Sequence, residues 1–165
     1  MSGSGRVLLA GAAALAVAAL AACAQVGQWT GQAEPRQPMT AGALTHLAAR
    51  LDGASEVPAN FTYARGAVQA TYDPATRTLA WTVTYDNLTG EVKAAHFHGP
   101  AAEGENAGVQ VDIGAGGLAS PMQGSATLTD AQAADLLAGR WYVNVHSSTY
   151  PDGEIRGWVK PTGGM

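Results

Sequence analysis

The sequence predicts an all-β fold, an antiparallel β-sandwich or barrel with one short helix. Apolar and polar residues alternate with a period of two in several short segments, as they do in half-buried strands. The 21 glycines of the 165-residue chain are typical of a protein with many turns. Only one segment carries the start and stop signals of a helix. About eight short strands separated by turns indicate a sheet that packs against itself.

The first three strands are expected at residues 45–51, 66–72 and 78–85. Asp73 and Pro74 lie between the second and the third segment. Proline presets φ and aspartate can bond its own backbone, so this pair favours a turn and a hairpin. The buried face of the third segment would carry Leu79, Trp81, Val83 and Tyr85.

The second half of the chain contains five more candidate strands and the helix. The strands are expected at residues 92–98, 108–113, 124–128, 141–146 and 154–159. Thr129 and Gln132 have the spacing of a capping box, which predicts that a helix begins there. Gly139 is placed to end that helix. A Tyr-Pro-Asp-Gly turn at 150–153 joins the last two strands.

The N-terminal segment has the organisation of a bacterial secretory signal. Arg6 precedes an apolar stretch that ends in small residues before Cys23, the one cysteine of the chain. The run Leu-Ala-Ala-Cys at 20–23 resembles a lipobox, in which the cysteine is acylated and the chain is cut before it. The resemblance implies that lipid at Cys23 anchors the protein, since two or more acyl chains hold firmly in a membrane. An uncleaved membrane helix and an unmodified cysteine are the alternatives.

This interpretation sets the domain boundaries and the location. We expect a lipoprotein signal peptide at 1–22, a flexible tether at 23–43, a folded domain at 44–161 and a tail at 162–165. The tether is rich in Gln, Pro and Gly without periodicity, so it buries too little to fold. Residue 24 is Ala, where Gram-negative lipoproteins of the inner membrane tend to carry Asp. The expected location is therefore the cell envelope, and in a Gram-negative cell the outer membrane, facing the periplasm.

Charge and thiol content exclude several classes of function. The chain has nine Lys and Arg and 13 Asp and Glu, and loss of Arg6 with the signal leaves eight basic residues. This acidic balance without a basic cluster argues against nucleic-acid binding. An acylated Cys23 leaves no thiol for a disulfide, a nucleophile or a metal site. No Gly-x-Ser-x-Gly elbow indicates a hydrolase, so the sequence favours a role other than catalysis.

Three histidines form the best candidate site. On a strand, residues i and i+2 point to the same side, so His96 and His98 share a face. The same rule places Tyr142, Asn144 and His146 together. If the two strands are neighbours, the three imidazoles converge, and imidazole suits copper or zinc at about 2.0–2.1 Å. Separations above about 7 Å would exclude one shared ion.

Three interpretations of these histidines stay open. In the first they close loops onto the sheet by hydrogen bonds, because both His98 and His146 directly precede loops. Asn144, Glu154 and Arg156 would then support these loops from neighbouring positions. In the second, His96, His98 and His146 bind a metal ion, with copper favoured over zinc. In the third, an enzyme is built on that metal. His46 lies outside these motifs and is expected to be an ordinary surface or edge residue.

Four motifs together resemble the CHRD domain family, over roughly residues 44–161. They are His-Phe-His-Gly-Pro-Ala at 96–101, Tyr-Val-Asn-Val-His at 142–146, Tyr-Pro-Asp-Gly-Glu-Ile-Arg-Gly at 150–157 and Leu-Asp-Gly-Ala-Ser-Glu-Val-Pro at 51–58. The resemblance implies an extracytoplasmic sandwich of immunoglobulin-like type but no defined activity. The His-x-His strand also looks like the copper half of Cu/Zn superoxide dismutases. No bridging ligand or zinc loop accompanies it, so dismutase activity is not expected.

The sequence thus predicts a lipid-anchored module of the cell envelope. Its partners would be the membrane, through the N-terminal lipid, and an envelope protein or a small ligand. The alternative function is metal binding through the three histidines.

Overall fold

A computed structural model describes residues 42–163, and Cys23 with the expected signal peptide and most of the tether lies outside them. The described part holds eight strands: β1 (Thr45–Asp52), β2 (Arg65–Asp73), β3 (Thr78–Asp86), β4 (Val92–His98), β5 (Val109–Asp112), β6 (Met122–Thr127), β7 (Trp141–Ser147) and β8 (Ile155–Pro161). It also holds the helix α1 (Asp130–Leu137) and two 3₁₀-helices, η1 (Gly53–Ser55) and η2 (Gly114–Gly116).

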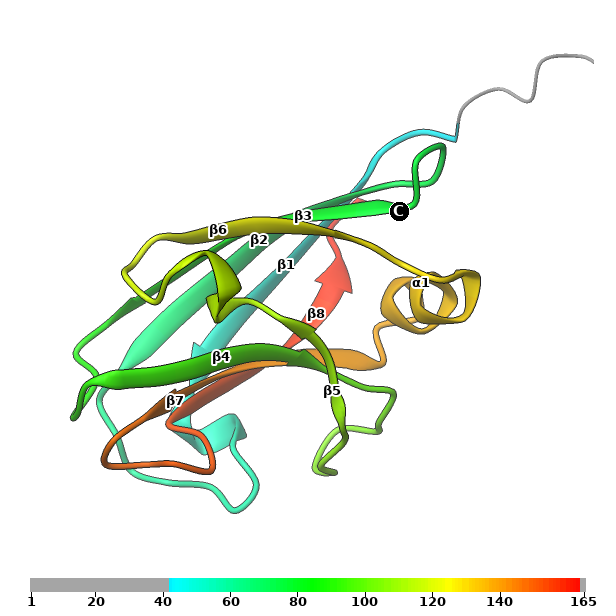
Figure 1. Cartoon of the computed structure of the whole chain (residues 1–165). Coiled ribbons are helices and arrows are strands. Elements are labelled where there is room, and N and C mark those ends of the chain that lie inside the picture. Colours follow the sequence, from blue (N-terminus) through cyan, green and yellow to red (C-terminus); the bar gives the residue numbers. More distant parts are fainter. Residues whose placement is uncertain (1–41, 164–165) are drawn as a thin grey trace, which may run out of the picture. The chain divides into compact units, whose positions relative to one another are not determined.

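The strands form one antiparallel sheet that folds over on itself. Their order is β5-β4-β7-β8-β1-β2-β3-β6. Figure 1 shows β6, β3, β2 and β1 lying over β4 and β7. Trp81 on β3 and Phe97 on β4 lie on strands far apart in this order, yet their ring centroids are 5.4 Å apart. The two halves of the sheet therefore pack face to face, and the predicted antiparallel sandwich with one short helix is confirmed.

The core lies between the two layers and follows the alternation of the strands. Leu79, Trp81 and Val83 are buried as predicted, whereas Tyr85 at the end of β3 is only partly covered. The facing layer contributes Ala95, Phe97, Trp141, Val143, Val145, Ile155 and Val159. The opposite faces of β4 and β7 therefore point away from the core, toward the loops and solvent.

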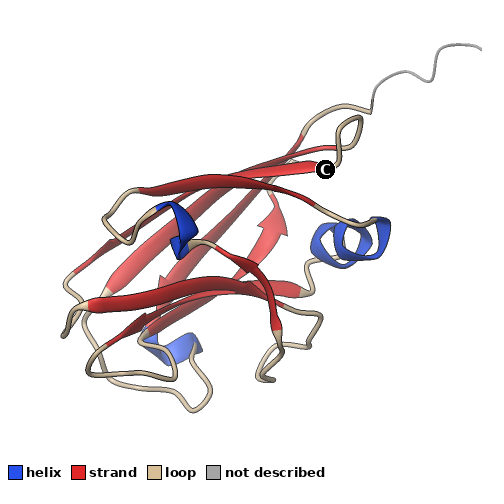
Figure 2. Ribbon diagram, viewed as in Figure 1, coloured by secondary structure: helices blue, strands red, loops and turns tan. Residues whose placement is uncertain are grey.

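The helix α1 closes one end of the sandwich between β6 and β7 (Figure 2). Its N-terminus has the predicted capping box: the Thr129 side chain accepts from Gln132 N, and the Gln132 side chain accepts from Thr129 N. Gly139 follows the helix with φ of +70°, a left-handed conformation that glycine adopts without steric cost. The local signals were therefore sufficient to place this element.

Two strands, β6 and β8, differ from the prediction by two residues at one end, and all other strand boundaries agree within one residue. The sequence indicated a strand at 124–128, but β6 begins at Met122, whose side chain is buried and whose backbone pairs with Val83. The last strand begins at Ile155 and runs on to Pro161, which pairs with Leu47 on β1. Pairing with a neighbouring strand extends both elements beyond their periodic segments.

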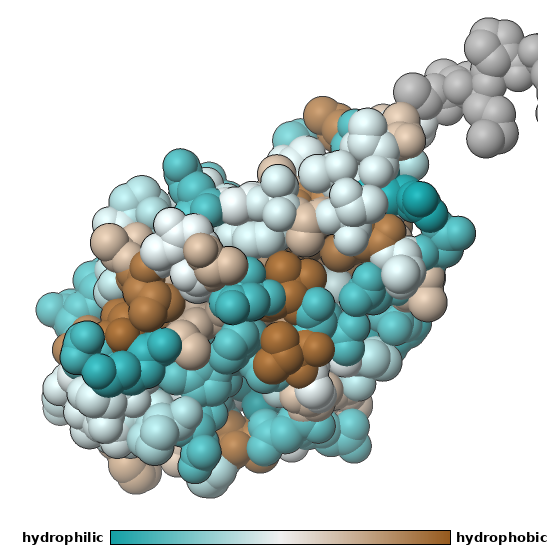
Figure 3. Space-filling model, viewed as in Figure 1, coloured by the Kyte–Doolittle hydropathy of each residue, from teal (hydrophilic) through white to brown (hydrophobic). Residues whose placement is uncertain are grey.

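The surface is mostly polar on the face shown in Figure 3, where apolar residues form separate patches. Scattered apolar residues of this kind are normal on a folded domain. Within residues 42–163, no helix is long and apolar enough to cross a membrane.

Candidate metal centre

The strands β4 and β7 are neighbours in the sheet, which is the condition that the sequence left open. Their register places His96 opposite Asn144, His98 opposite Tyr142 and Ala94 opposite His146. Phe97 and Val143, which alternate with these residues, face the core. The three histidines therefore lie together on the outer face of this layer.

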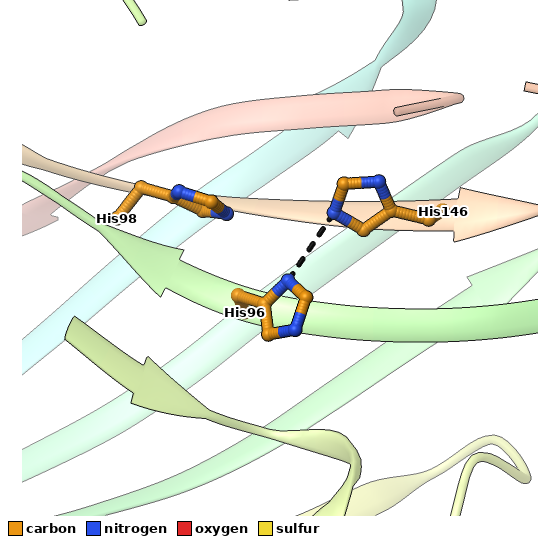
Figure 4. Close-up of side chains that lie close together, drawn as sticks. All are labelled: His96, His98 and His146. Carbon is orange, nitrogen blue, oxygen red and sulfur yellow. Dashed lines mark hydrogen bonds between the residues drawn. The ribbon is translucent and has the colours of Figure 1, made fainter. Parts of the chain in front are cut away.

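The three imidazoles converge (Figure 4). One ring nitrogen from each of His96, His98 and His146 lies within 4.8 Å of the others. His96 Nδ1 is 3.2 Å from His146 Nε2. Three nitrogens that share an ion at about 2.0–2.1 Å are roughly 3.3–4.1 Å apart. Ring rotations that move the nitrogens by about 1 Å or less would bring the three separations into this range.

Backbone carbonyls fix the protonation of two of the rings. His98 Nδ1 lies 2.9 Å from the Ala107 carbonyl oxygen, and His146 Nδ1 lies 2.9 Å from that of Pro151. A carbonyl oxygen only accepts, so both Nδ1 atoms carry the proton and both Nε2 atoms of the neutral rings present lone pairs. In metal sites, a carbonyl or carboxylate that accepts from the outer ring nitrogen fixes the orientation and tautomer of the histidine in the same way.

Buried polar atoms without partners border the cluster. Among the described residues, His98 Nε2 and Asn144 Oδ1 are buried and have no hydrogen-bond partner. An unsatisfied buried acceptor costs about 1–3 kcal/mol. Such atoms need a donor or an ion, and a metal at the cluster would satisfy the lone pair of His98 Nε2 at once.

The site favours neutral, ligand-ready imidazoles. Burial, followed by the nearby His146 and His98 rings, holds the pKa of His96 below its usual 6.5, against an opposing effect of Asp112. Burial also lowers the pKa of His98, although its contacts with Ala107 and Asn144 act in the other direction. Metal ligands must be deprotonated, so these two rings are available below the pH at which an ordinary histidine becomes protonated.

The family assignment rests on a comparison with known protein families. The family profile of the CHRD domain matches residues 47–159, most of the described sandwich. The chain belongs to the CHRD domain family. No curated protein and no solved structure matches it significantly.

In this CHRD domain the His98 ring stacks on Tyr142, which in turn stacks on Arg156. The Tyr142 ring is parallel to the His98 ring, with centroids 4.9 Å apart and an interplanar angle of 3°. The guanidinium of Arg156 lies 3.5 Å from the centre of the Tyr142 ring. The Tyr142 hydroxyl accepts a bond from Ala107 N at 3.1 Å, so the same loop residue contacts both rings. The stack fixes the plane of the His98 imidazole.

Arg156 and Glu154 bind loops around the CHRD sandwich. Arg156 is fully buried and donates to Asn106 Oδ1 at 2.8 Å and to the Glu105 carbonyl, in the loop that follows His98. Glu154 lies just before β8 and accepts from Thr62 Oγ1 at 2.7 Å and from Thr89 N at 2.9 Å. Both residues thus bind loops, Arg156 the loop after His98 and Glu154 the loops that contain Thr62 and Thr89.

The pKa of Glu154 reflects these contacts. Burial acts to raise this pKa, but hydrogen bonds from Ser147, Thr62 and Thr89 outweigh it, so the pKa lies below its usual value. The carboxylate therefore stays ionised in the folded domain.

Sequence reasoning missed several contributors to the site. The Ala107 and Pro151 carbonyls belong to loops, and no residue type signals a backbone acceptor. The histidines that these carbonyls bind, His98 and His146, lie on strands that the period of two predicted. His46 lies on β1, which is not adjacent to β4 or β7 in the sheet. Its Nδ1 contacts Thr71 Oγ1 at 3.2 Å, and it takes no part in the cluster.

Glu56 is a buried acid whose ionisation should destabilise the domain. Its side chain is 6% exposed and its Oε1 has no partner among the described residues. Burial raises the pKa of Glu56 from 4.5 to about 7, against the opposing effects of Arg156 and the Val57 amide. Because the folded state holds this proton more tightly than the unfolded state, stability falls as the pH rises from about 4.5 to 7.

Glu56→Gln is expected to remove this pH dependence. The wild-type free energy of unfolding should drop by up to about 3 kcal/mol relative to the variant between pH 5 and pH 8. Urea unfolding of both proteins at the two pH values measures the difference, in which the titration of all other groups cancels. Parallel pH profiles of the two proteins would contradict the prediction.

Proposed function

We propose that this CHRD domain binds one first-row transition-metal ion through His96, His98 and His146. The observation that supports it most is the convergence of three ring nitrogens within 4.8 Å, two of them on rings whose outer nitrogens are bonded to backbone carbonyls. Nε2 of His98 is buried and has no hydrogen-bond partner among the described residues. A metal ion would satisfy that atom.

Copper is the favoured ion. Nitrogen-donor sites bind divalent copper more tightly than divalent zinc, and imidazole suits both. Three protein ligands leave a further coordination position for water or a small ligand. Asn144, whose Oδ1 is buried beside the cluster without a partner among the described residues, would be able to accept a hydrogen bond from such a water.

A metal titration tests this proposal. The purified protein, without a polyhistidine tag and stripped by a chelator, is titrated with Cu(II) and with Zn(II) in competition with a chromophoric chelator. We expect saturation at one equivalent of Cu(II), with weaker binding of Zn(II). Absence of saturable binding of either ion would refute the metal centre.

A second candidate function is a binding module held at a membrane, and exposed aromatic residues favour it. Phe61 and Tyr63 are 99% and 87% exposed, in the segment between η1 and β2. Aromatic side chains are enriched at protein interfaces. A pocket of about 290 Å³ lies between this segment and the turn after β7, lined by Pro58, Asn60, Tyr150 and other residues of the two loops.

In this second candidate, lipid at Cys23 would anchor the protein in the cell envelope, facing the periplasm from the outer membrane in a Gram-negative cell. The partner would be an envelope protein. Mass spectrometry of the protein from membranes would detect a chain that begins at an acylated Cys23. An intact leader or a free thiol would remove the anchor, and an unchanged set of cross-linked proteins after Phe61→Ser would remove the aromatic surface.

A further inference from the structure

We infer that Asp112 positions His96 for metal binding by accepting a hydrogen bond from the ring nitrogen that points away from the cluster. The inference rests on the proposed metal centre and adds a residue to it. His98 and His146 each have a backbone carbonyl on the outer nitrogen. Asp112 would supply the corresponding acceptor for His96.

The register of the sheet places Asp112 beside His96. The edge strand β5 pairs with β4, and His96 lies directly opposite Asp112. Ile113 N donates to the Ala95 carbonyl at 2.9 Å. A backbone bond at this flanking position makes His96 and Asp112 a non-hydrogen-bonded pair of the antiparallel ladder, the type whose side chains come closest. Residues directly opposite share a face, with Cβ atoms about 4.5–5.5 Å apart.

The orientation of the His96 ring leaves one nitrogen for this contact. Its Nδ1 is hydrogen-bonded to His146 Nε2 in this structure, a contact that an ion held by both atoms would replace, with the His96 proton moving to Nε2. Figure 4 shows that other ring nitrogen on the opposite side of the ring, toward β5. Asp112 Oδ1 accepts from Gly114 N at 2.8 Å, which orients the carboxylate and leaves Oδ2 for His96. Asp112 is also the carboxylate that acts on the charge of the His96 ring.

A carboxylate on Nε2 would have two effects on the ligand. It fixes the tautomer that carries the proton on Nε2, so Nδ1 presents its lone pair to the ion, and it raises the basicity of the ring. The metal would then be bound by Nδ1 of His96 and by Nε2 of His98 and His146. Loss of such an outer partner typically weakens metal binding 10–100-fold.

The test compares Asp112→Ala and Asp112→Asn with Asp73→Ala. Asp73 is a matched control because it also ends a strand and its Oδ1 also accepts from the amide two residues on, Ala75 N at 2.8 Å. We expect Asp112→Ala to weaken Cu(II) binding about 10–100-fold. Asp112→Asn, which keeps an acceptor oxygen, should lose less, and Asp73→Ala should bind as the wild type does.

A second readout separates positioning from a general loss of order. Proton NMR of the zinc-loaded protein reports whether the Nε2 proton of His96 is held in a hydrogen bond. This proton should exchange slowly with water in the wild type and in Asp112→Asn, and rapidly in Asp112→Ala. Equal affinities for Asp112→Ala and Asp73→Ala, or an unchanged exchange rate of this proton in Asp112→Ala, would overturn the inference. A wild type without copper affinity would instead refute the metal centre itself.

Discussion

His98→Ala and His146→Ala should each weaken Cu(II) binding by more than the roughly 10–100-fold that loss of an outer-shell partner costs. Each variant removes one of three nitrogens that lie within 4.8 Å of one another. Each variant would hold the ion by only two protein nitrogens, one from His96 and one from the remaining histidine. The effect should therefore exceed that of Asp112→Ala.

His46→Ala is the matched control, because His46 is the remaining histidine of the chain and contacts Thr71 on the neighbouring strand β2, outside the cluster. It should leave copper affinity unchanged. Competition titrations of the three variants measure the effect, and thermal unfolding verifies that each is folded. Equal affinities for His98→Ala, His146→Ala and His46→Ala would assign the copper to another site.

Gly157→Ala is expected to destabilise the domain by about 3 kcal/mol or more, at the upper end of the range for overpacked sites. A Cβ at Gly157 would lie 1.9 Å from the Arg50 carbonyl oxygen and 2.9 Å from Leu51 Cδ2. The carbonyl belongs to the backbone of β1, so relief requires β8 and β1 to separate. These strands join the two halves of the sheet, and a domain with 5–15 kcal/mol of stability would lose a large part of it.

Gly108→Ala provides the comparison, because nothing lies within 4 Å of a Cβ at that position. Urea unfolding of both variants and the wild type gives the two differences in free energy. We expect a change within about 0.5 kcal/mol for Gly108→Ala, as for most surface substitutions. Similar midpoints for Gly157→Ala and the wild type would show that β1 and β8 separate at little cost.

Local patterns predicted the elements of this fold better than their partners. The period of two located β3 and β4, and the capping box located α1, because these signals lie within a few residues. The start of β6 at Met122 was missed because the Gln123-Gly124-Ser125 run has no periodicity, and only pairing with β3 makes it a strand. The order of the sheet depends on contacts between distant segments and could not be read from single segments.

The candidate site divides in the same way. The faces of His96, His98 and His146 follow from strand geometry, so their convergence could be anticipated once β4 and β7 were assumed to be neighbours. The Ala107 and Pro151 carbonyls depend on loop conformation. Asp112 depends on the register between β4 and β5, where a shift near His98 brings it opposite His96. The supporting shell was therefore beyond sequence reasoning.

The central claim is that the three histidines of this CHRD domain bind one metal ion. Anomalous diffraction at the copper edge from crystals of the copper-loaded protein tests it most directly. The account predicts a single strong peak at about 2.0 Å from His96 Nδ1, His98 Nε2 and His146 Nε2. A peak at other residues, or none at these three in fully loaded crystals, would contradict it.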